Sequence, residues 1–145
     1  MKKNILLITA AWLIWASEIQ AQATTEKQRI EQGVAWLKQV SSVAVEWTNN
    51  PEKKAYRQQL QALVKSFGKI KEDITLIYIE RQAKAEGIAM IGLLDEVHDA
   101  ATDILLHLKD DKSLDDPTAV LLSQEEAENR IVPASKKAIE ALTGL

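Results

Sequence analysis

Hydrophobic residues recur every three or four positions along most of this chain, and this spacing is typical of amphipathic helices. Such stripes predict helices over residues 24–48, 51–86 and 88–109, and a last helix from residue 123 to near Gly144. The sequence therefore predicts an all-α fold, a single up-and-down bundle of about four helices. In the first helix the stripe consists of Ile30, Val34, Leu37, Val40, Ala44 and Trp47.

The strongest repeat lies in residues 51–86, where the spacing between apolar residues alternates between four and three. Such a seam faces a partner helix in coiled coils and supercoiled bundles. Gly68 lies off the seam, and the sequence leaves open whether the helix continues straight through it. Ile74–Ile79 is apolar on nearly every side, so we expect neighbouring helices to cover it on several faces. The seam consists of Tyr56, Leu60, Leu63, Phe67, Ile70, Ile74 and Ile77.

Capping and turn residues indicate where the first three helices begin and end. Thr24 or Thr25 can cap the first helix, which is expected to end near residue 48. Asn50 can cap the second, with Pro51 at its first position, where a missing N–H costs nothing. Gly87 is the expected break before the third helix.

The C-terminal quarter of the chain contains three further boundary signals. Asp116 and Pro117 close a polar loop and start a short turn of helix. Ser123 has the spacing of a capping box with Glu126 and is expected to open the last helix. Pro133 lacks a backbone donor and should kink or split that helix.

The first 23 residues have the layout of a secretory signal peptide, although an uncleaved anchor or a buried helix is the alternative. Lys2 and Lys3 precede an apolar run, Ile5–Ala16, which is too short to span a bilayer comfortably. Small residues at Ala21 and Ala23 flank a cleavage site. We therefore expect residues 24–145 to form one domain in the periplasm or outside the cell, with no stable membrane anchor.

Cysteine content and charge narrow the possible functions. The chain contains no cysteine, which excludes disulfides, a lipid-modified cysteine and thiol catalysis.

Charge is divided unevenly along the chain. Residues 26–71 contain nine Lys/Arg and four Asp/Glu, whereas residues 72–145 contain seven Lys/Arg and sixteen Asp/Glu. Residues 26–145 together thus have a net charge of −4, which argues against nucleic-acid binding. The opposite charges of the two halves favour basic helices lying beside acidic ones, with steering toward a charged partner or head-to-tail self-association as alternatives.

The stretch Asp95–His107 contains both histidines and four acids, which are residue types that bind metal ions. Each helical residue advances by about 100°, so His98 and His107 point in opposite directions and cannot bind one ion. Asp95 and His98 remain weak candidates for a metal or small-ligand site completed by another helix. The alternative is a boundary histidine held by Asp95 or Thr102, with Asp103 and His107 as an exposed pair.

The sequence lacks common motifs of enzymes and cofactor sites. The sequence has no Gly-x-Ser-x-Gly, no Cys-x-x-Cys-His haem attachment and no glycine-rich phosphate loop. We therefore expect a non-enzymatic protein without a cofactor.

Trp36, Val43 and Trp47 lie on one flank of the first helix and widen its apolar arc to about 200°. They are the candidate partner-binding residues, because tryptophan is enriched among interface hot spots. The alternative is that both tryptophans complete the core. The expected function is binding of another protein, as an inhibitor or immunity protein, a secretion or conjugation accessory, or an envelope chaperone. Neither the partner nor the oligomeric state follows from the sequence.

Overall fold

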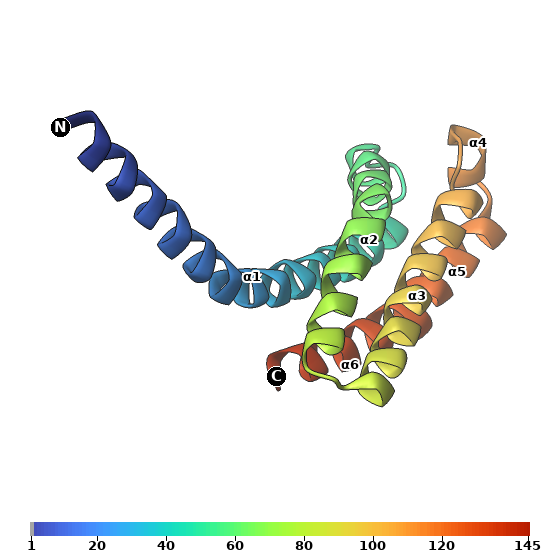
Figure 1. Ribbon diagram of the computed structural model, residues 1–145. Helices are drawn as coiled ribbons and strands as arrows, with labels where there is room; N and C mark the ends of the chain where they lie inside the picture. Colours follow the sequence, from blue (N-terminus) through green and yellow to red (C-terminus); the bar gives the residue numbers. More distant parts are fainter. Residues whose placement is uncertain (1) are drawn as a thin grey trace.

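The computed structural model describes the backbone of residues 2–145 and the side chains of residues 26–145. Four long packed helices form an up-and-down bundle, as the hydrophobic pattern predicts (Figure 1). The signal-peptide prediction and the expected cap at Thr24 or Thr25 lie outside the residues with described side chains. The elements are α1 (Lys2–Asn49), α2 (Ala55–Glu80), α3 (Lys84–His107), α4 (Asp111–Leu114), α5 (Pro117–Glu125), the π-helical turn η1 (Glu126–Ile131) and α6 (Val132–Thr143).

The helices enclose one apolar core. α1 packs against α2 and α6, while α3 packs against α2, η1 and α6. α5, η1 and α6 follow one another without a break and together act as the fourth long helix (Figure 1). The larger side chains with no exposed surface are Leu37, Trp47, Leu60, Ile74, Ile77, Leu94, Ile104, Leu108 and Ile131.

Asn50 ends α1 instead of capping α2. Its backbone N–H donates to the carbonyls of Glu46 and Trp47, and its Nδ2 donates to the Glu46 carbonyl at 3.1 Å. These bonds satisfy carbonyls that the end of a helix leaves without partners. α2 begins only at Ala55. The predictions that Asn50 caps the second helix and that Pro51 is its first residue are therefore wrong.

The seam predicted for α2 is confirmed. All of its residues are buried or half-buried, and the helix is continuous through Gly68, which faces open space. The expectation for Ile74–Ile79 is only partly correct. Ile74, Ile77 and Tyr78 are buried, but Ile79 is 64% exposed. Among residues 26–145, no helix covers that side of α2 near its C-terminal end.

The break between α2 and α3 falls before Gly87, at residues 81–83. Gln82 makes the turn with a positive φ of 57°, a conformation that only glycine adopts without cost. Gly87 lies within α3 and is buried, and a Cβ there would lie 3.0 Å from the Tyr78 Cβ. The prediction that Gly87 ends a helix is therefore wrong, because this glycine permits two helices to approach closely.

The last long helix starts at Pro117, with Asp116 as its cap. The predicted helix start at this pair is confirmed, but it opens the long helix instead of a short turn. Ser123 does not open a helix. It is buried inside α5, and its hydroxyl donates to the Ala119 carbonyl. Pro133 does not split the helix, since it lies in the first turn of α6 and α6 follows the π-helical turn η1 without a break.

Ion pairs join the basic N-terminal half to the acidic C-terminal half. Lys71 Nζ lies 2.8 Å from Asp95 Oδ1, and Arg29 Nη1 lies 3.3 Å from Glu80 Oε1. This agrees with the expectation that basic helices lie beside acidic ones. These pairs are partly exposed, so each contributes at most about 1 kcal/mol.

Candidate functional site

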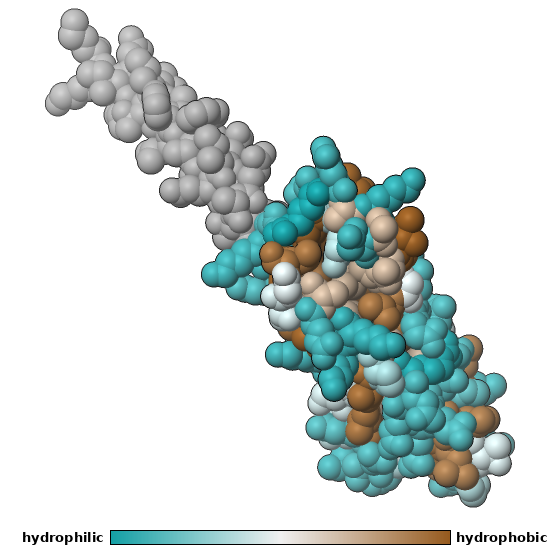
Figure 2. All heavy atoms as spheres, turned by 90° about the horizontal axis from the view of Figure 1, so that it is seen from below, coloured by the Kyte–Doolittle hydropathy of each residue, from teal (hydrophilic) through white to brown (hydrophobic). Residues whose placement is uncertain are grey.

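An exposed apolar surface lies at the hairpin between α2 and α3. A groove of about 370 Å³ runs between the two helices there. Ile79 of α2 and Ile88 of α3 flank it and are 64% and 62% exposed, while Ile91 lines it from the next turn of α3. We call these three residues, with Tyr78 and Gly87, the hairpin groove. Figure 2 views the molecule from this end and shows hydrophobic patches among hydrophilic side chains.

The floor of the hairpin groove follows from the close approach at Gly87. Because Gly87 has no side chain, the ring of Tyr78 packs directly against α3 and is only 4% exposed. Burial of the ring raises the pKa of Tyr78 above its ordinary value. The groove therefore has a rigid wall and an apolar lining.

The rim of the hairpin groove is polar and slightly basic. Gln82 and Lys84 line it, and no acidic residue does so within the described part of the chain. Lys84 makes no ion pair with any residue from 26 to 145. The chemistry offered to a ligand is thus an apolar trough with one positive charge beside it.

The candidate partner-binding residues predicted on α1 do not line the hairpin groove. Trp36 and Trp47 are 3% and 0% exposed, so both indoles belong to the core and offer no surface to a partner. Trp36 Nε1 donates to the Leu63 carbonyl of α2 at 2.8 Å, and its ring contacts Phe67. The wide apolar arc is therefore covered by α2 on its flank. Val43 is half-buried and lines a shallow groove between α1 and α2.

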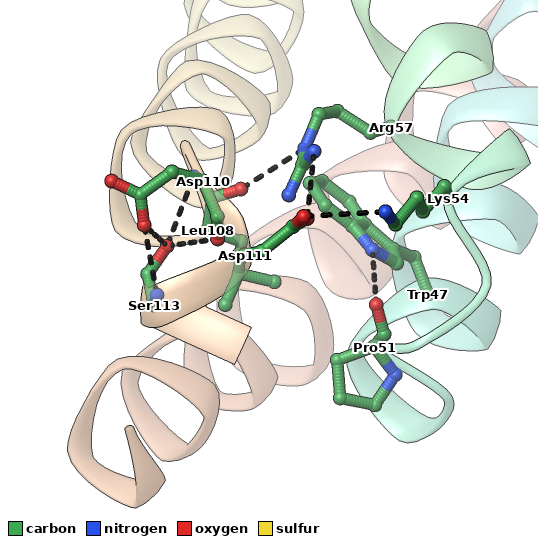
Figure 3. Close-up of polar contacts among 8 residues, drawn as sticks. All are labelled: Trp47, Pro51, Lys54, Arg57, Leu108, Asp110, Asp111 and Ser113. Atoms are coloured by element: carbon green, nitrogen blue, oxygen red, sulfur yellow. Dashed lines mark hydrogen bonds and ion pairs between the residues drawn. The ribbon is translucent and has the colours of Figure 1, made fainter. Parts of the chain in front are cut away.

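Trp47 is held at the end of the bundle where α1, α2 and α4 meet (Figure 3). Its Nε1 donates to the Pro51 carbonyl at 3.3 Å, and the Arg57 guanidinium lies 5.8 Å from the centre of its ring. Arg57 Nε also donates to the carbonyl of Leu108, and Asp111 pairs with Lys54 beside it. These contacts tie the α1–α2 turn to the start of α4.

Asp95 and His98 are not brought together as a metal site. Asp95 pairs with Lys71, whereas His98 stacks on Phe67 with 4.2 Å between ring centres and contacts Asp99 at 3.1 Å. Within residues 26–145, no three or more side chains of the types His, Cys, Asp and Glu are grouped so that they could hold a metal ion. His98 lies at the edge of the core, as one alternative predicted, but its side-chain partners are Phe67 and Asp99.

An arginine cluster that the sequence did not indicate joins α3 to η1. Arg130 Nε donates to Glu96 at 2.7 Å, and its Nη1 donates to Asp103 at 2.9 Å and also to Glu126. Arg130 holds the pKa of Glu96 below its usual range. Asp103 therefore pairs with Arg130, and the prediction of an exposed pair with His107 is wrong. This cluster stabilises the packing of η1 on α3. The guanidinium of Arg130 is occupied by three acids of its own chain.

Comparison with known proteins adds no family assignment. The chain matches no protein-family model, no curated protein and no solved structure. Across the described residues, none of the helices combines the length and apolar character needed to cross a membrane.

Proposed function

We propose that this protein is an exported, non-enzymatic helical bundle that binds another protein through the hairpin groove. The observation that carries the proposal is the pair of large aliphatic side chains, Ile79 and Ile88, exposed on either side of a preformed apolar trough. Single exposed apolar residues are ordinary on protein surfaces, but two that flank an apolar groove are typical of an interaction site.

Covering the hairpin groove would release a useful amount of free energy. Complete burial of one isoleucine side chain contributes about 1.5–3 kcal/mol. Ile79 and Ile88 both have most of their surface still available for burial. Since the wall formed by Tyr78 and Gly87 is already in place, a partner would not need to order it on binding.

The occupant that fits best is an amphipathic helix of a different protein. A helix laid along a groove inserts apolar side chains at every third or fourth position. Lys84 at the rim favours a partner with an acidic residue next to those apolar positions. An inhibitor or immunity protein, a secretion or conjugation accessory and an envelope chaperone could all use such a surface.

A peptide titration tests this proposal. The probe is a fluorescent helical peptide with leucines along one face and a glutamate beside them, and its binding is followed by anisotropy. I88D should weaken binding by at least about tenfold, because an interface hot spot contributes about 1.4 kcal/mol or more. I88D should change folding stability by no more than about 0.5 kcal/mol, since the side chain is exposed.

The matched control is L121D, because Leu121 of α5 is 61% exposed but lies outside the hairpin groove. L121D should bind the peptide like the original protein. Equal losses in L121D and I88D would contradict the proposal, as would a peptide that binds I88D unchanged. Sedimentation analysis measures the oligomeric state of the original protein and of I88D. If the original protein is a dimer and I88D is a monomer, the partner at the hairpin groove is a second copy of this chain.

A further inference from the structure

A second groove, of about 380 Å³, lies between α1 and α6 and shares no residue with the hairpin groove. Its α1 side is formed by Lys38, Ser41 and Ser42. From α6, Ser135 and Lys136 also line it. A volume of this size lies in the range of small-molecule sites, about 300–1,000 Å³. We call it the serine groove.

Ser135 is the unusual member of the serine groove. It is 2% exposed, and its hydroxyl has no hydrogen-bond partner among residues 26–145. Three other buried or half-buried hydroxyls inside these helices, those of Thr48, Thr75 and Ser123, donate to the carbonyl four residues earlier. A buried polar group without a partner costs about 1–3 kcal/mol, and a ligand bound in the groove would supply that partner. Rotation to another staggered χ1 position can turn the hydroxyl toward that ligand.

The charges around the serine groove favour a monoanion. Lys38 and Lys136 line it and form no ion pair with any residue in the described range 26–145. Glu140 is the one acid in the lining, so the charged side chains sum to +1. Val132 and Ile139 supply an apolar surface next to these groups.

We infer that the serine groove binds a small monocarboxylate with a short aliphatic chain. The carboxylate oxygens accept hydrogen bonds from Lys38, Lys136 and the Ser135 hydroxyl. The aliphatic chain lies against Val132 and Ile139. This second site concerns a small molecule and does not depend on the hairpin groove or its partner.

Titration of the ¹⁵N-labelled protein with hexanoate, followed by NMR, tests this inference. Hexanoate should cause saturable shifts in the amide signals of residues 38–42, of Val132 and of residues 134–140. S135A should bind hexanoate about threefold to tenfold more weakly, the effect of one lost hydrogen bond. Its thermal stability should be unchanged or higher, because the variant removes a buried hydroxyl without a partner. K38Q/K136Q should abolish the shifts, whereas K137Q, on the same helix but outside the lining, should not.

Two further probes separate the contributions of charge and apolar chain. Hexanol should bind far more weakly than hexanoate, and equal binding would overturn recognition of the carboxylate. Inorganic phosphate should leave the amides of Val132 and Ile139 unshifted, and phosphate shifts equal to those of hexanoate would overturn the role of the aliphatic chain. Absence of saturable hexanoate shifts, or S135A with unchanged affinity, would also overturn the inference.

Discussion

Replacing Gly87 by alanine would test the close approach of α2 and α3 that builds the hairpin groove. A Cβ at this position would lie 3.0 Å from the Cβ of Tyr78 and 3.5 Å from its Cγ. The Tyr78 Cβ is attached to the backbone, so a change of rotamer cannot move it away. We therefore expect G87A to push the two helices apart locally.

The magnitude follows from comparison with Gly92, which lies on the same helix and would have no atom within 4 Å of an added Cβ. Alanine at Gly92 should stabilise the protein by about 1 kcal/mol through helix propensity. At Gly87 that gain is opposed by overpacking, which costs about 1–3 kcal/mol. G87A should thus lie between the original stability and about 2 kcal/mol below it, and about 1–3 kcal/mol below G92A.

The assay is urea unfolding of the original protein, G87A and G92A, followed by circular dichroism at one temperature and pH. Linear extrapolation yields the free energy of unfolding, and an unchanged slope shows that the compared states are the same. An equal gain in stability for G87A and G92A would refute the reasoning, because it would mean that α3 does not contact Tyr78 at this distance.

Three further predictions concern the core, the arginine cluster and the hairpin turn. W47A should lower the free energy of unfolding by about 3–5 kcal/mol in urea titrations, because Trp47 is fully buried; a loss below about 1 kcal/mol would place the indole outside the core. Because Arg130 lowers the pKa of Glu96, the ionised carboxylate stabilises the fold above about pH 4.3 and this contribution disappears as the pH falls further. E96Q should therefore flatten the acid side of the curve of stability against pH, and an unchanged curve would contradict the pairing. Q82G should raise the melting temperature, since glycine relieves the positive φ of Gln82, whereas a lower value would show that the turn has a different conformation.

The sequence by itself determined the helical class of the protein and most of its buried faces. The seam of α2 could be listed in advance because a helical repeat is a local property, set by a rotation of about 100° per residue. The start at Pro117 was equally local, since Asp116 caps the helix and proline suits its first position.

Only the tertiary structure decided which apolar faces are covered and where two helices meet. Periodicity shows that Trp36 and Ile79 both belong to apolar arcs, but it does not say how many neighbours each arc has. α2 covers Trp36, whereas Ile79 stays 64% exposed beside the other described helices.

Neither the position of the hairpin turn nor the serine groove could be predicted from the sequence, because both depend on contacts between distant segments. Sequence alone predicts a helix end at Gly87, but in the structure Tyr78 packs against this glycine and the turn lies at Gln82. Ser135 and Lys38 are far apart in the chain and become neighbours of one groove only when α6 packs on α1. Local spacing determines what a segment forms, whereas contacts between distant segments determine which of its side chains remain available for binding.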